Sequence, residues 1–174
     1  MNAADREQIL KLMAESDQAL FGAVAGVSDE QARSRPAPDR WSILECLEHV
    51  ILVDDSIVRG ADTHSTPGAP PEDRSREERI LRGTTDRTRK LPAPERLLPM
   101  GRHSSLPEAV EEYRKCRART VAYIEQYQDD PRARTMMHPA FGPLSCQEMF
   151  LVLALHPKRH ALQIQEVRQT LGLE

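Results

Sequence analysis

Apolar side chains recur three or four positions apart in four stretches of this chain, the spacing that places them along one face of a helix. The first stretch covers about 3–25 and is followed by Gly26. The others run from about 42 to 60, from about 105 to 129 and from about 145 to 170. Their stripes contain, in turn, Ile9, Met13, Leu20 and Val24; Leu44, Leu47, Ile51 and Val58; Val110, Tyr113, Val121, Ile124 and Tyr127; and the apolar run within 150–167. The sequence therefore predicts four long amphipathic helices.

Three of these helices are predicted to begin at the same signature, a serine followed three residues later by a glutamate. In such a capping box the serine hydroxyl accepts a hydrogen bond from the first turn, and the glutamate carboxylate accepts one from the serine N–H. The pairs are Ser42 and Glu45, Ser105 and Glu108, and Ser145 and Glu148. Trp41 directly precedes the first pair, where an apolar side chain can pack onto the opening turns. These signals fix the starts of the second, third and last helices.

The segment between the second and third helices is long and poorly patterned. Residues 60–71 contain three prolines and two glycines, and residues 74–90 predict one further helix of modest length. Pro92 and Pro94 keep the following stretch irregular. No stretch shows the alternation of a strand. We therefore expect an all-α protein with a single domain over residues 1–174, a four-helix bundle with a long crossover between its second and third helices.

The composition argues against some classes of function but does not identify an activity. The net charge is −3 and charged residues make up 29% of the chain, which gives no reason to expect nucleic-acid or membrane binding. The amino-terminal residues lack the apolar core of a secretory signal. Three widely spaced cysteines do not make a disulfide framework. These features favour a cytoplasmic protein.

The segment between the second and third predicted helices carries an excess of positive charge. Residues 74–102 hold nine basic side chains against four acidic ones. A solvated surface explains such a run without any function, and a landing area for an anionic substrate is the functional alternative. Binding of nucleic acid through this segment is the weakest interpretation, because the chain as a whole is acidic and such binding depends on phosphate neutralisation.

The last predicted helix carries two histidines, His156 and His160, four residues apart. At 3.6 residues per turn this spacing puts both imidazoles on one face, where their nitrogens can hold one metal ion. Two histidines on a packed helix face are the alternative, and the pair alone does not decide between the two. Pro157 lies between them, where it removes a backbone donor and crowds the carbonyl of Leu153. A kink is therefore expected between the two histidines.

A third metal ligand is predicted at His49, inside the second helix. His49 lies ~10 Å past the start of its helix and His156 ~17 Å past the start of its own, at 1.5 Å rise per residue. Antiparallel helices of ~27 Å would bring the two to similar heights, and bundle cores commonly host metals between facing helices. A lone buried histidine is more often a hydrogen-bonded core residue, but the facing pair favours a metal site.

Several short motifs of this sequence are similar to those of a known protein family. The shared features are Trp-Ser-Ile-Leu-Glu over 41–45 followed by His49, His-Pro-Ala-Phe-Gly over 138–142, and His156, His160 and Gln163 in the last helix. The set is similar to the DinB-like proteins, which include the YfiT type, over nearly the whole chain. The resemblance implies an up-down-down-up bundle with a divalent metal ion on His49, His156 and His160. It also implies hydrolase or thiol-transferase chemistry. Pro157 departs from the pattern, since members often have another residue after the first late histidine.

A three-histidine site has definite chemical consequences. Three neutral imidazoles leave a divalent ion with its full charge and with open coordination positions, the layout of a catalytic rather than a closed structural site. Zinc is the expected ion, and nickel, iron and manganese also suit imidazole. Glu45, one turn before His49, is a candidate to orient that ring, although its capping role explains it alone. His138 is a candidate proton shuttle, and Gln163 is a candidate to orient a ligand.

The expected function is metal-dependent activation of a thiol or of water for attack on a small electrophilic substrate, as in a thiol S-transferase or a hydrolase. The partner would then be a small molecule, with a low-molecular-weight thiol as one candidate. The alternative is a non-catalytic, stress-related bundle in which the metal is structural and ties the second helix to the last. A homodimer formed through exposed helix faces is compatible with both.

Overall fold

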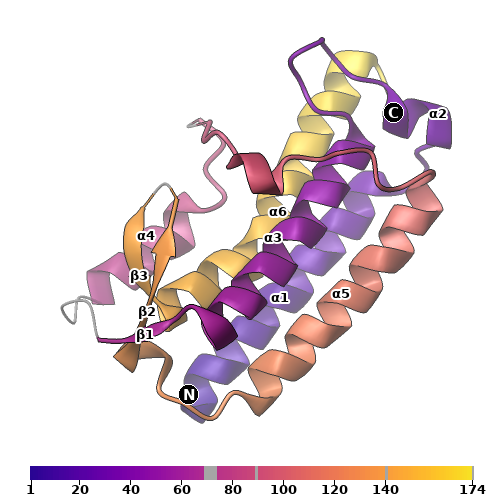
Figure 1. Ribbon diagram of the computed structural model, residues 1–174. Coiled ribbons are helices and arrows are strands. Elements are labelled where there is room, and N and C mark those ends of the chain that lie inside the picture. Colours follow the sequence, from indigo (N-terminus) through magenta and orange to yellow (C-terminus); the bar gives the residue numbers. More distant parts are fainter. Residues whose placement is uncertain (69–73, 89, 140, 174) are drawn as a thin grey trace.

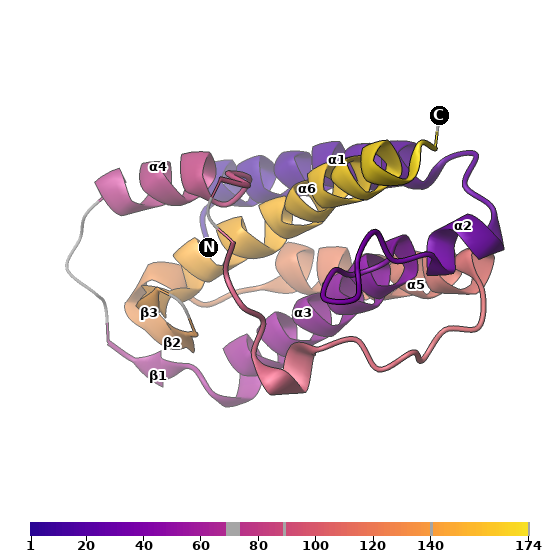
Figure 2. The ribbon, with the colours of Figure 1, turned by 90° about the horizontal axis from the view of Figure 1, so that it is seen from above.

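Four long helices lie side by side, and shorter elements gather at their ends and along one side (Figures 1 and 2). The computed structural model describes residues 1–68, 74–88, 90–139 and 141–173. In chain order the elements are α1 (Ala3–Val24), α2 (Asp29–Arg33), α3 (Ile43–Thr63), β1 (Thr66–Pro67), α4 (Arg74–Gly83), η1 (Glu95–Leu97), α5 (Leu106–Gln126), η2 (Pro131–Ala133), β2 (Arg134–His138), β3 (Gly142–Ser145) and α6 (Cys146–Leu171), where η marks a short 3₁₀ helix.

The long helices α1, α3, α5 and α6 form the predicted four-helix bundle, in up-down-down-up order (Figure 1). Helices α1 and α6 are parallel, and the side chain of Arg168 near the end of α6 donates to the carbonyls of Ala23 and Ala25 at the end of α1. Helix α3 is antiparallel to α6, as the predicted heights of the histidines require. The helical fold class is confirmed, and the long crossover lies between α3 and α5.

The bundle core consists of two apolar halves with a polar layer between them. One half surrounds Leu47 and Ile164, and the other surrounds Ile9 and Phe150. Every long helix contributes to both halves. The polar side chains buried between the halves are Ser16 on α1, Asp54 on α3, and Arg117 and Thr120 on α5, each at most 4% exposed. Both clusters meet α6 on either side of the turn that carries its histidines.

The predicted helix starts are confirmed. The hydroxyls of Ser42, Ser105 and Ser145 each accept the N–H of the glutamate three residues later. The boxes at Ser42 and Ser145 are reciprocal. The box at Ser105 is not, because the carboxylate of Glu108 instead accepts from the N–H and hydroxyl of Ser104. One side-chain cap is therefore enough to start α5, where Pro107 also stands in the first turn.

The expectation of no strands is wrong for one small region. Strands β1, β2 and β3 form an antiparallel sheet in that order at the end of the bundle where α6 begins (Figure 1). These strands have two to five residues, too few for an alternating pattern to stand out. Gly142 in the β2–β3 hairpin has φ +72°, a conformation that favours glycine. Ala140 in this hairpin lies outside the described residues.

Gly60 was expected to end the second helix, but α3 continues to Thr63. The glycine has a packing role instead. A Cβ at Gly60 would lie 2.6 Å from Cε of Met136 in β2, closer than van der Waals contact allows. The missing side chain leaves this space to the terminal methyl group of Met136, which would have to move for any other residue at position 60.

The crossover contains less helix than expected. Helix α4 ends at Gly83 rather than near residue 90, and Arg89 lies outside the described residues. The chain then runs past α6 and α3, makes the single turn η1 and reaches α5 (Figure 2). No helix in the described part of the chain is long and apolar enough to cross a bilayer.

Candidate metal centre

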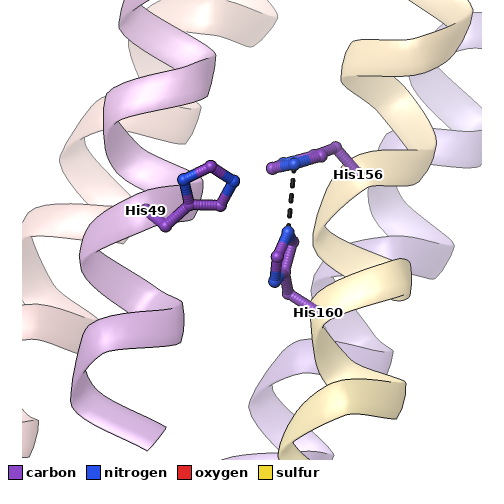
Figure 3. Close-up of side chains that lie close together, drawn as sticks. All are labelled: His49, His156 and His160. Atoms are coloured by element: carbon purple, nitrogen blue, oxygen red, sulfur yellow. Dashed lines mark hydrogen bonds between the residues drawn. The ribbon is translucent and has the colours of Figure 1, made fainter. Parts of the chain in front are cut away.

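The structure brings the three predicted histidines together between α3 and α6. His49 comes from the second turn of α3, and His156 and His160 come from successive turns of α6, with all three rings directed into the space between the helices (Figure 3). One ligand nitrogen from each ring lies within 4.8 Å of the others. Among the described residues this is the group of histidine, cysteine and acidic side chains that could hold a metal ion.

The spacing of the α6 pair suits a shared ion. The Nε2 atoms of His156 and His160 are 3.1 Å apart (Figure 3). Two imidazole nitrogens on one tetrahedral zinc ion, each ~2.0–2.1 Å from it, are separated by ~3.3 Å. At a separation of up to 4.8 Å, His49 would have to move inward to share the same ion. Without an ion, one of the two Nε2 atoms donates its hydrogen to the other.

The tautomer of His49 is fixed by the crossover. Its Nδ1 lies 2.8 Å from the carbonyl oxygen of Leu97 in η1. A carbonyl can only accept, so Nδ1 carries the hydrogen and the lone pair of Nε2 is left to face the other two rings. A backbone acceptor of this kind orients a metal ligand and raises its basicity. By contrast, the buried Nδ1 atoms of His156 and His160 have no hydrogen-bond partner within the described residues.

Burial keeps all three rings neutral. Removal from water lowers the pKa of His49, although the Leu97 carbonyl acts in the opposite direction. Burial lowers the pKa of His156 and of His160 well below the usual value, and the neighbouring histidines lower both further. Trp41 packs against His49 and His160, with ring centroids 4.8 Å and 6.3 Å away. Neutral imidazoles have free lone pairs, so this set fits a divalent metal ion.

A cavity of about 970 Å³ lies against the three histidines. Its walls come from α3 and the loop before it, from α6, from the crossover and from the β2–β3 hairpin. The basic side chains that line it are Arg40, Arg59, Arg87, Lys90, Arg96, Arg102 and Arg159, against the acidic Asp39 and Asp55. Four of these basic residues belong to the segment 74–102, so part of that segment forms a cavity wall.

Glu45 does not contact His49. Its carboxylate accepts the N–H of Ser42 at 2.8 Å and is ion-paired with Arg35. The capping geometry turns this side chain back toward the start of α3. The group that orients His49 is therefore the carbonyl of Leu97 and not the carboxylate of Glu45.

His138 and Gln163 both line the cavity but stand outside the three-histidine cluster. The ring of His138 stacks on Phe141, with centroids 4.6 Å apart, and its Nδ1 accepts the N–H of Phe141. Burial lowers the pKa of His138. The side-chain oxygen of Gln163 accepts from Arg87 at 3.1 Å. His138 thus belongs to the cavity wall beside Phe141, whereas Gln163 holds a cavity arginine.

Glu48 is a site residue that the sequence analysis missed. Its carboxylate is 2% exposed and accepts the backbone N–H groups of Met100, Gly101 and Arg102 at 2.7–3.1 Å. This clamp holds the crossover against α3 one residue away from His49. It thereby also holds Leu97, the acceptor for His49. The available signal was an acidic residue among the apolar positions of the second helix.

Fold and site together define a four-helix bundle with a candidate three-histidine metal site between two antiparallel helices. The chain belongs to the DinB superfamily, whose sequence model matches residues 12–164.

Individual proteins are also similar to this chain, in sequence or in fold. The chain is 28% identical over 144 residues to the uncharacterized protein YuaE of Bacillus subtilis strain 168, which covers 83% of this chain and 87% of that protein. The fold of this chain is similar to that of YfiT from Bacillus subtilis, described as a probable metal-dependent hydrolase with an unusual four-helix bundle topology. The comparison with YfiT gives a TM-score of 0.62 at 14% identity and covers 100% of this chain and 91% of the YfiT chain. TT2238, a four-helix bundle protein, gives a TM-score of 0.59 at 22% identity, over 92% and 98% of the two chains.

Removing any one of the three histidines should weaken metal binding. We expect His49→Ala, His156→Ala and His160→Ala each to lower zinc affinity by at least ~10-fold, since each deletes a direct ligand. The measurement is a competition titration of metal-free protein, with elemental analysis of the reconstituted samples. His103→Ala, a histidine outside the cavity lining, is the matched control and should bind as the wild type does. A reconstituted wild type without metal, or equal binding by all four variants, would contradict the assignment.

The metal-free protein should lose stability on acidification below about pH 6.5, the ordinary histidine pKa. The unfolded chain takes up protons there first, because the folded pKa values of His49, His156 and His160 are lowered. The free energy of unfolding therefore falls as pH falls through this window and levels off above it. Urea denaturation in a chelator between about pH 5 and pH 8 measures the slope.

The control for this experiment is the triple variant His49→Gln, His156→Gln and His160→Gln. Burial raises the pKa of Asp54 to about 6, which acts in the opposite direction over part of the window. The difference between wild type and variant removes that contribution. Identical pH profiles for the two proteins would show that the histidines are not kept neutral by burial.

Proposed function

We propose that this chain is a metal-dependent enzyme that activates a thiol or water for attack on a small electrophilic substrate. In this proposal His49, His156 and His160 hold the ion. The observation that carries it is the cavity of about 970 Å³ bordered by all three histidines, because a metal that only tied two helices together would need no such space. The description of the structurally similar YfiT as a probable metal-dependent hydrolase supports the same class of activity.

The chemistry is divided between the ion and the protein. A bound divalent ion, proposed to be zinc with nickel, iron and manganese as alternatives, would supply a Lewis acid that lowers the pKa of a thiol or water ligand. The protein contributes neutral ligands that leave the positive charge undiminished. The Leu97 carbonyl holds His49 in its binding tautomer. Trp41 covers the rings of His49 and His160 and limits access of bulk water to them.

In the thiol reaction the S–H bond breaks, the sulfur forms a bond to an electrophilic carbon, and the leaving group departs with the electron pair of its broken bond. The released proton goes to the leaving group. In hydrolysis a water molecule takes the place of the thiol. His138 lines the cavity and burial favours its neutral form, so we assign it the transfer of this proton.

The charge of the cavity wall favours an anionic thiol or substrate. Arg59, Lys90 and Arg96 line the cavity, are exposed and make no ion pair with another described residue. Basic side chains around a partly enclosed site attract molecules of the opposite charge and orient carboxylate or phosphate groups. We therefore propose a low-molecular-weight thiol that carries acidic groups as the first candidate.

The test is a panel of thiols, electrophiles and esters incubated with the metal-loaded protein, with products identified by mass spectrometry. We expect turnover with an acidic thiol or with water, lost in His49→Ala. Arg59→Ala and Arg96→Ala should each raise KM for the acidic thiol roughly 2- to 5-fold, the size of an exposed ion pair, with little change in kcat. The increase should shrink at high salt.

Arg114→Ala is the control for these charge changes. Arg114 lies on α5 over the ring of Phe21, outside the cavity lining, so its removal changes the net charge equally without changing KM. No modified or cleaved electrophile across the panel would refute the enzymatic proposal. A large fall in melting temperature on chelation, without any turnover, would favour a structural metal instead.

A further inference from the structure

The guanidinium of Arg117 lies in the polar layer of the bundle and reaches the three other long helices. Its side chain is 4% exposed. Nε donates to Asp17 on α1 at 2.9 Å, and Nη1 donates to Asp54 on α3 at 3.0 Å. On the side of α6, Nη1 and Nη2 face the carbonyl oxygens of Leu153 and Ala154, each at 3.5 Å. Arg117 on α5 therefore contacts α1, α3 and α6 at the same level of the bundle.

The carbonyl of Leu153 lacks its ordinary partner. In a regular helix it would accept from the N–H four residues later, but that residue is Pro157, which has none. Leu153 is 0% exposed and Pro157 is buried, so bulk water does not reach this carbonyl. Helix α6 nevertheless stays helical from Cys146 to Leu171, without a break at the proline.

The geometry of its donors explains why a buried arginine stands at position 117. A buried ion pair adds little stability compared with a well-packed apolar core, so Asp17 and Asp54 do not by themselves explain a buried guanidinium. A guanidinium presents its donors in a rigid planar fork. That fork serves two carboxylates and the helix carbonyls from three different nitrogens, whereas the three donors of a lysine all lie on one nitrogen.

The turn that lacks a donor, residues 153–157, contains His156 and leads directly to His160. We propose that Arg117 is a positioning residue for the metal site, whose guanidinium replaces the backbone donor missing at Pro157 and thereby holds His156 and His160 one helical turn apart on one face. The functional meaning of this inference rests on the proposed metal binding. The contact with α6 can be tested without any metal.

The experiment is a double-mutant cycle between Arg117 and Pro157. Pro157→Ala restores the N–H that the Leu153 carbonyl lacks, so α6 should no longer depend on Arg117. We expect Arg117→Lys to weaken zinc affinity by about tenfold in the wild-type background. In the Pro157→Ala background the same substitution should change it by less than about twofold. The visible spectrum of the cobalt-loaded protein should shift in Arg117→Lys and return toward the wild type in the double variant.

Asp17→Asn is the matched control, because it removes the negative charge beside the same guanidinium on the side facing α1. It should lower the melting temperature while leaving zinc affinity and the cobalt spectrum unchanged. The proposal is overturned if Arg117→Lys weakens zinc binding equally with and without the proline. It is also overturned if Asp17→Asn changes the metal site as much as Arg117→Lys does.

The cycle also covers the case in which no metal binds. The midpoint of urea unfolding of the metal-free proteins then replaces zinc affinity. If Arg117→Lys lowers this midpoint less in the Pro157→Ala background than in the wild type, the contact with α6 is supported even though the proposed function has failed. If the two substitutions lower the midpoint additively, the inference is overturned. If Arg117→Lys does not fold alone, folding of the double variant supports the inference. Failure of both to fold, while Asp17→Asn folds, refutes it.

Discussion

The candidate metal centre depends on three uncharged imidazole rings that are held close together and away from water. Neutral rings repel one another little, but each has a nitrogen lone pair that must find a donor or an ion. Two antiparallel helices supply the rings at one height, and Trp41 covers two of them. Only His49 has its tautomer set by the protein, through Leu97. A bound ion would satisfy the remaining lone pairs, which is why the chemistry of the donor set favours a cation.

The parts of this structure that follow from local rules could be predicted from the sequence. Apolar periodicity gave the four long helices, and serine–glutamate pairs gave three of their starts. The i,i+4 spacing of His156 and His160, with the helix rise, was enough to find His49. The acceptor for His49 could not be found this way, because a backbone carbonyl has no side chain to mark it. Sequence distance points to Glu45 instead, whereas the first turn of α3 uses that carboxylate as a cap.

Other features escaped prediction because they depend on contacts between distant segments. The sheet is built from strands of two to five residues, and Gly60 is explained only by Met136, more than seventy residues away in the sequence. Arg117 interrupts an inward stripe that includes Tyr113 and Ile124, and its partners lie on three other helices. A charged residue at a core position marks a polar interaction, but the pattern of one helix does not say with what.

The clamp formed by Glu48 has an evolutionary consequence. It fixes residues 100–102, and the same crossover provides both Leu97 behind His49 and several basic side chains of the cavity wall. A change in the length or path of this loop would therefore alter the pocket and the ligand orientation together. Among homologues, variation in this loop would then change the pocket wall and the orientation of His49 as one unit. Grafting this loop between family members would transfer both structural features at once.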